Sequence, residues 1–130
     1  MSVRHVYVIG VAAILGCASN PSEMGIPKSP STLLTATDIV TAKADNGSLY
    51  DAILRMRPNW LAAHGQMSSN PDSNPYATVF LDGQQFGSID ALRRIQAYHV
   101  ASARYYDITQ AGARFGIKGG MGGVIEVTSR

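Results

Sequence analysis

The chain has 130 residues, with 11 lysines and arginines, 9 aspartates and glutamates and a formal net charge of +2. This near balance gives no reason to expect nucleic acid as a partner, because phosphate binding requires clustered cationic side chains. The single cysteine excludes a disulfide bond within the chain. The length is that of one modest domain.

The N-terminus has the pattern of an export signal. Arg4 and His5 precede an apolar run from Val6 to Leu15, which closes on small residues around Cys17. The 13 residues from Val6 to Ala18 are too few for a spanning helix, since about 20 are needed to cross the hydrocarbon core. We therefore expect a cleaved signal rather than a permanent membrane helix here.

The position of Cys17 indicates the kind of signal. Residues Ile14 to Cys17 resemble the lipobox of bacterial lipoprotein precursors, although Leu15 departs from the smaller residue commoner at its position. The resemblance implies a signal peptide of residues 1–16, acylation of Cys17 with chains such as palmitate, and a membrane as partner through this lipid anchor. Each CH₂ group buried in the bilayer contributes about 0.8 kcal/mol to membrane binding, so two acyl chains would anchor the protein stably. The alternative is an ordinary signal cut nearby, which would leave a free thiol.

Two helices are predicted after a flexible segment. Residues 17–31 are rich in Ser, Pro, Gly and Asn and are typical of a tether, so the folded domain is expected to cover residues 32–130. Thr37 is the expected N-cap of a helix of one or two turns. Ser48 to Asp51 approximates a capping box that opens a longer helix, which Pro58 should end.

The second half predicts alternating strands and short helices, after an exposed loop from Gly65 to Pro75. Asp82-Gly83 between two β-branched and aromatic runs is a strong hairpin signal. The expected elements are hairpin strands at 77–81 and 84–86, a short helix capped by Ser88 or Asp90, a strand at 103–108, a helix at 110–115 capped by Thr109, and a last strand at 124–128. This order predicts an α+β fold with a small mixed β-sheet and short helices packed on it.

Glycines gather ahead of the last predicted strand, at Gly116, Gly119, Gly120, Gly122 and Gly123. A phosphate-binding loop would need its glycines between a strand and a helix, with Gly-Lys-Ser/Thr in the Walker case. These glycines instead follow a helix, which Gly116 should end, and precede a strand. We interpret them, together with Asp82 and Gly83, as structural turns that need positive φ.

Few side chains could carry catalysis. His64 and His99 are the histidines left after removal of the signal, and neither stands at metal-ligand spacing from another His, Cys or carboxylate. No metal or cofactor is therefore expected. A small exported enzyme that uses His64 or His99 with a carboxylate such as Asp72 or Asp90 stays open as an alternative.

The stretch around the only tryptophan is the candidate binding surface. Arg55, Arg57 and Trp60 combine two guanidinium groups with an indole, and these residue types are enriched at binding hot spots. The alternative is that Trp60 and Leu61 cover the sheet while both arginines face water.

Five segments follow one another in the order of a known domain: Val79 to Gly83, Ile89 to Leu92, Ala103 to Asp107, Ala111 to Gly116, and Gly120 to Val127. Together they resemble the plug domain of TonB-dependent outer-membrane receptors, over residues 33–130 and most specifically in the second half. A receptor of that family continues into a membrane barrel, whereas this sequence ends at Arg130 and has no convincing TonB box near its N-terminus. The resemblance therefore implies a stand-alone plug-like domain.

The resulting expectation is a non-catalytic lipoprotein in the cell envelope of a Gram-negative-type bacterium, which binds a protein partner or a small ligand. Ala18 stands in place of the Asp that retains many lipoproteins at the inner membrane, so the outer membrane is favoured, with the domain facing the periplasm. An outer-membrane barrel or another envelope protein is the expected partner. The small enzyme and a receptor-gene fragment without independent function are the alternatives.

Overall fold

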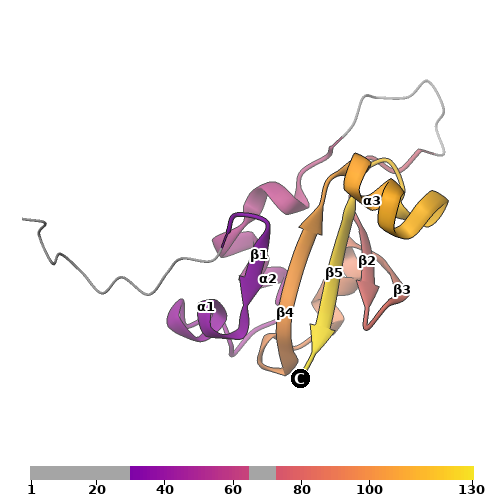
Figure 1. Cartoon of the computed structure of the whole chain (residues 1–130). Coiled ribbons are helices and arrows are strands. Elements are labelled where there is room, and N and C mark those ends of the chain that lie inside the picture. The colour runs from indigo at the N-terminus through magenta and orange to yellow at the C-terminus, as the bar shows by residue number, and fades with distance from the viewer. Residues whose placement is uncertain (1–29, 65–72) are drawn as a thin grey trace, which may run out of the picture.

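The computed structural model describes residues 30–64 and 73–130 (Figure 1). The predictions about the signal, Cys17, most of the tether and most of the loop from Gly65 to Pro75 lie outside these residues. The helices are α1 (Ala36–Thr41), α2 (Leu49–Met56) and α3 (Ile108–Phe115), with 3₁₀ segments η1 (Pro58–Leu61), η2 (Ile89–Arg94), η3 (Ala97–His99) and η4 (Gly116–Gly119). Within the described residues, every helix is too short or too polar to cross a membrane.

Five strands form one mixed sheet in the order β1-β4-β5-β2-β3. They are β1 (Leu33–Thr35), β2 (Thr78–Leu81), β3 (Gln84–Ser88), β4 (Val100–Tyr106) and β5 (Val124–Ser129). β2 and β5 pair in parallel, and the other neighbouring strands pair antiparallel. The predicted α+β fold, a small mixed sheet with short helices packed on it, is confirmed.

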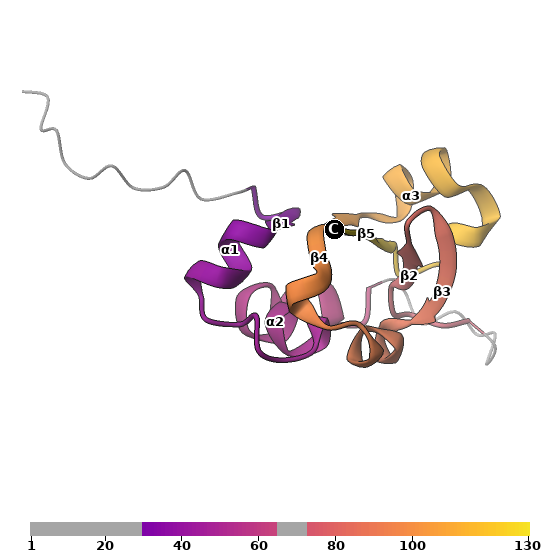
Figure 2. The same ribbon diagram turned by 90° about the horizontal axis from the view of Figure 1, so that it is seen from below.

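The two faces of the sheet are covered unequally (Figure 2). α2 lies against one face, where strand residues such as Val79 and Ile125 join its apolar side in the main core. α3 lies on the opposite face, over a smaller cluster of Phe80, Ala111 and Val124. Because successive side chains of a strand point to opposite faces, β2 and β5 contribute to both clusters.

The first strand is not among the predicted elements, and it changes where α1 begins. Leu34 and Thr35 pair with β4, but three residues are too few to show strand alternation in the sequence. Thr35, not Thr37, is the N-cap, because its backbone is extended (φ −97°, ψ 163°) and its hydroxyl accepts from the Asp38 amide at 3.2 Å. Asp38 completes the capping box by accepting from the Thr35 amide at 2.9 Å.

α2 begins and ends as predicted. The Ser48 hydroxyl oxygen accepts from the Asp51 amide at 3.2 Å, which satisfies one of the free amides of the first turn. The helix ends at Met56, and Pro58 begins η1, as expected from the restriction that a proline places on the residue before it. The buried side of the helix consists of Leu49, Ala52 and Ile53.

The hairpin between β2 and β3 is confirmed. Asp82 and Gly83 both have positive φ, +49° and +85°, as a two-residue type I′ turn requires. The helix predicted next is the 3₁₀ segment η2 rather than an α-helix. Ser88 occupies its N-cap position, but its side chain makes no capping hydrogen bond.

α3 begins at Ile108, two residues earlier than predicted. Asp107 is its N-cap, since a carboxylate oxygen of this residue accepts from the Gln110 amide at 2.8 Å. Thr109, the predicted cap, therefore lies inside the helix. Gly116 follows the last helical residue with φ +62°, so the predicted glycine at the end of this helix is confirmed.

Candidate functional site

The predicted binding surface at Arg55, Arg57 and Trp60 does not form. Trp60 is 1% exposed and Arg57 is 7% exposed, so Arg55 alone of the three presents its side chain to solvent. The Trp60 indole nitrogen donates to the carbonyl oxygen of Ser31 at 3.1 Å, and the Arg57 guanidinium donates to that of Leu33 at 3.4 Å. Both side chains thus fasten the segment of β1, a long-range role that their local sequence does not reveal.

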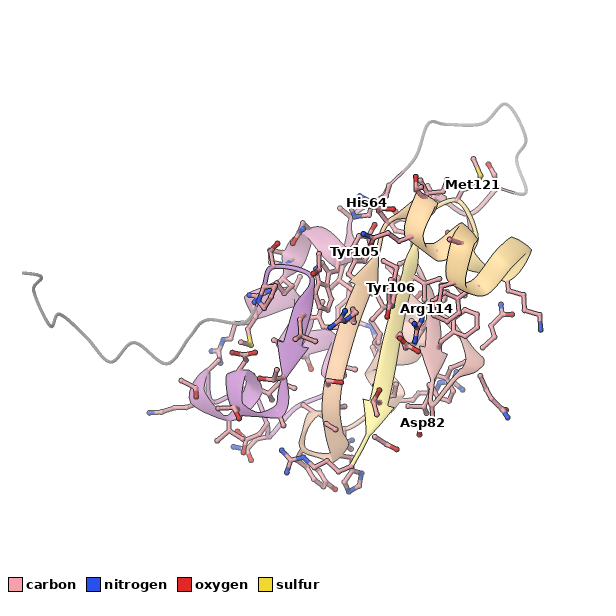
Figure 3. All side chains as sticks on the ribbon, viewed as in Figure 1. His64, Asp82, Tyr105, Tyr106, Arg114 and Met121 are labelled. Carbon is pink, nitrogen blue, oxygen red and sulfur yellow. The ribbon has the colours of Figure 1, made fainter. Side chains whose placement is uncertain are left out.

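An aromatic column occupies the space beside Trp60. Tyr105 on β4 lies between Trp60 and His64, with ring centroids 6.0 Å and 5.3 Å away, and Figure 3 shows His64 close to Tyr105. The Tyr105 hydroxyl donates to the carbonyl oxygen of Gly122 at 3.2 Å. Burial raises the pKa of Tyr105, and the negative charge of Asp107 raises it further. The column joins η1, β4 and the glycine turn.

The environment of His64 bears on the enzyme alternative. Its ring nitrogen Nε2 is hydrogen-bonded to the backbone carbonyl oxygen of Asn59. Asp72, one carboxylate considered as its partner, lies outside the described residues. Asp90, the other, lies 3.7 Å from the guanidinium of Arg93 on the same 3₁₀ segment. The described structure therefore does not bring His64 together with a carboxylate.

His99 lies at the opposite end of β4 from Tyr105. Its side chain is exposed and packs edge-on against Tyr98, with ring centroids 4.0 Å apart. In residues 30–64 and 73–130, no three side chains of His, Cys, Asp or Glu converge where a metal ion could bind. His99 does border a cavity, which is described below.

The sheet face opposite the main core is only partly covered, and we call its uncovered part the open face. By strand alternation it presents Leu33, Thr35, Ser102, Arg104, Glu126 and Thr128. Thr35 pairs with Ser102, and Ser102 pairs with Thr128, so three hydroxyl groups form a row across β1, β4 and β5. Arg104 pairs with Glu126 in the next row. Apart from Leu33, which pairs with Arg104, the open face is therefore polar.

A hydrogen-bonded network lies where α3 meets the open face (Figure 3). Glu126 accepts from the Tyr106 hydroxyl at 2.9 Å and from the Arg114 guanidinium at 3.3 Å. The guanidinium carbon of Arg114 is also 5.3 Å from the centre of the Tyr106 ring. Burial and the hydrogen bond to Glu126 raise the pKa of Tyr106. The network ties α3 to the two central antiparallel strands.

A cavity of about 240 Å³ lies where β5 ends, and we call it the β5-end cavity. Its floor is apolar and consists of Leu81, Phe86, Ile95, Val100 and Val127, and its polar rim consists of Arg94, Gln96, His99 and Ser129. These residues come from distant stretches of the chain, so no sequence motif marks the cavity.

One wall of the cavity is fastened by Asp82, the first residue of the hairpin turn. Its carboxylate accepts from the Ser129 amide at 2.9 Å and from the Ser129 hydroxyl at 2.6 Å. The side-chain hydrogen bond, followed by the backbone one, lowers the pKa of the Asp82 carboxyl. Asp82 therefore both shapes the turn and ties the hairpin to the end of β5 (Figure 3).

The glycine cluster leads the chain from α3 into β5. Three of its members have positive φ, as the turn interpretation requires: Gly116, Gly120 and Gly123. Gly119 and Gly122 do not, which corrects that interpretation for these two. Gly122 is required for space instead, because a Cβ atom there would lie 2.2 Å from the carbonyl oxygen of Tyr76.

A scan against protein-family models found no matching family, and searches of curated proteins and of solved structures found no match either. The function is therefore inferred from the sequence pattern and from the geometry described above.

Proposed function

We propose that this chain is a non-catalytic exported lipoprotein, whose plug-like domain binds a protein partner or a small ligand at the periplasmic face of an outer membrane. Residues 1–16 act as the signal peptide, acylated Cys17 is the anchor, and residues 17–31 are the tether. The protein partner is an outer-membrane barrel or another envelope protein.

The placement of the plug-like segments in one sheet carries the proposal. The segment Val79 to Gly83 forms most of β2 and the hairpin turn, and the segment Gly120 to Val127 forms the glycine turn and most of β5. These two segments are far apart in the sequence, yet they pair directly, with Val79 opposite Ile125 in the parallel ladder. Their pairing supports the interpretation that the plug-like segments belong to one domain.

The open face is the surface that we assign to the protein partner. The hydroxyl groups of Ser102 and Thr128 can both donate and accept hydrogen bonds, whereas the Thr35 hydroxyl is engaged with Asp38 in the cap of α1. Arg104 is exposed beside that row, and arginine is enriched at protein interfaces. The short side chains of Ser102 and Thr128 also let a partner approach closely at that row, because they have few rotamers to order on binding.

Metabolic labelling with a clickable fatty acid tests the anchor. We expect label on the unaltered protein and none on Cys17→Ala, because the thiol is the acceptor of the acyl chain. Ser19→Ala is the matched control, since it alters the neighbouring sequence and keeps the thiol. Equal labelling of the unaltered protein and Cys17→Ala would refute lipidation at this residue.

Photo-crosslinking in the native envelope tests the partner. A photoreactive amino acid at Arg104 is expected to capture an outer-membrane barrel or another envelope protein. The same amino acid at Leu54, which is 50% exposed on α2, serves as the control because α2 covers the opposite side of the sheet. Equal capture from both positions, or none from Arg104, would contradict the assignment of the open face.

A further inference from the structure

We propose that the β5-end cavity binds a small organic anion with an unbranched hydrocarbon body and a carboxylate head. This names the ligand class of the binding function proposed above and rests on it. The lining of the cavity includes Ser129 at the end of β5, and this strand end lies beside the mark C in Figure 1.

The floor is apolar and preformed. Phe86 comes from the hairpin, Ile95 follows η2, Val100 begins β4, and Val127 lies near the end of β5. Val100 and Val127 are at most 1% exposed, and Ile95 is 8% exposed, so the floor is part of the main core and held by its packing. Concave apolar sites with a few polar groups at the rim are the usual form of small-molecule sites.

The volume indicates how large a part of a ligand the cavity can hold. A cavity of about 240 Å³ has room for roughly eight non-hydrogen atoms, if each takes the ~30 Å³ of a water molecule in the liquid. Hexanoate, with six carbons and two oxygens, has this size. Its hydrocarbon chain can pack on the apolar floor, which leaves its carboxylate at the polar rim.

The charge at the rim favours an anion. Arg94 borders the cavity, with its guanidinium carbon 4.9 Å from the centre of the Phe86 ring. Within the described residues, the two ion pairs are formed by Arg93 with Asp90 and by Arg114 with Glu126, so Arg94 has no carboxylate within pairing distance there. A guanidinium group at the edge of an apolar floor can bind a carboxylate with two parallel hydrogen bonds.

One acidic group beside the rim, the Asp82 carboxylate, is already engaged. Both carboxylate oxygens of Asp82 accept hydrogen bonds from Ser129, and no Asp or Glu is among the described residues that line the cavity. The Arg130 side chain lies close by, since it donates to the carbonyl oxygen of Val100 at 3.2 Å. The cavity is therefore suited to a negative head group and disfavours a cationic one.

Methyl NMR spectra of the purified full chain, titrated in turn with hexanoate, hexan-1-ol and hexylammonium, test the proposal. Hexanoate is expected to shift the methyl signals of Ile95, Val100 and Val127. The methyl signals of Leu34 and Ile39, which belong to the main core but do not line the cavity, should stay in place. Hexanoate should bind about tenfold more tightly than hexan-1-ol, or about 1.4 kcal/mol, and hexylammonium should bind least.

Arg94→Gln should remove the tenfold preference for hexanoate, whereas Arg93→Gln, at the neighbouring residue paired with Asp90, should keep it. Equal binding of the three ligands, tightest binding of hexylammonium, or no shift at the cavity methyl groups would each overturn the proposal. The comparison of the three ligands uses the unaltered chain, so it tests the preference for an anion even if Arg94→Gln does not fold. Acyl labelling and crosslinking at Arg104 do not involve the cavity, so their failure is distinguishable from a failure here.

Discussion

Adding one methyl group at Gly122 should destabilise the fold far more than the size of the change suggests. A Cβ atom at Gly122 would lie 2.2 Å from the carbonyl carbon and oxygen of Tyr76 and 2.5 Å from the carbonyl oxygen of Pro75. All three are backbone atoms, so no change of rotamer can make room. The glycine turn would have to move away from Tyr76. That movement would strain two hydrogen bonds, because the carbonyl oxygen of Gly122 accepts from the Tyr105 hydroxyl and that of Gly123 accepts from the Thr78 amide at 3.0 Å.

The expected loss for Gly122→Ala is about 3 kcal/mol, the upper end of the usual cost of overpacking, because the clash is with main chain. A domain of this size has a free energy of unfolding on the order of 5–15 kcal/mol, so the change would remove a large part of it. Gly112→Ala is the matched control. Gly112 lies in α3, and nothing stands within 4 Å of a Cβ there, so alanine should stabilise the helix by about 0.5–1 kcal/mol.

Urea unfolding followed by tryptophan fluorescence measures both changes. Trp60 is the only tryptophan and is 1% exposed, so its emission reports the transfer of the core to water. Linear extrapolation gives the free energy of unfolding for each variant. If Gly122→Ala stayed within about 0.5 kcal/mol of the unaltered protein, the range typical of surface changes, the close approach to Tyr76 would be wrong.

Two further predictions concern a helix cap and a carboxylate. Thr35→Ala should cost about 1 kcal/mol, because the hydroxyl that accepts from the Asp38 amide is lost, whereas Thr37→Ala should be neutral or slightly stabilising; equal losses in urea unfolding would contradict the observed cap. Asp82→Asn keeps the turn, since asparagine tolerates positive φ, but removes the charge that Ser129 stabilises. Because these hydrogen bonds lower the pKa of Asp82 in the folded state, their stabilisation is present above the ordinary carboxyl pKa and is lost as the pH falls through the lower folded value. The difference in unfolding free energy between Asp82→Asn and the unaltered protein should therefore shrink as the pH is lowered below about 4, and a constant difference would refute this explanation.

The elements predicted from the sequence are those whose signals are local. The hairpin follows from Asp82-Gly83, because few residue pairs tolerate positive φ at both positions. The start of α2 follows from the N-cap Ser48, and its end follows from Pro58, because each of these residues affects only the few residues next to it. The end of α3 follows from Gly116 for the same reason.

The features that were missed depend on contacts between distant parts of the chain. β1 exists because β4 offers it a partner, and Thr35 becomes a cap because that strand ends there. Arg57 looks like a surface residue in the sequence, but its guanidinium reaches the carbonyl oxygen of Leu33 across the layers. The β5-end cavity has the same origin, since Phe86 and Val127 meet there only after the sheet has formed.

The two proposed sites share β5 but use opposite sides of it. Val127 faces the β5-end cavity, whereas Thr128, the next residue, faces the open face. Coupling between two sites requires an element with two arrangements that both ligands bias. β5 is paired with β4 on one side and with β2 on the other, and Asp82 hydrogen-bonds to Ser129 at its end, so β5 has little freedom to change position. We therefore expect the free energies of hexanoate binding and partner binding to add, and a large mutual effect would indicate that the hairpin moves when the cavity is filled.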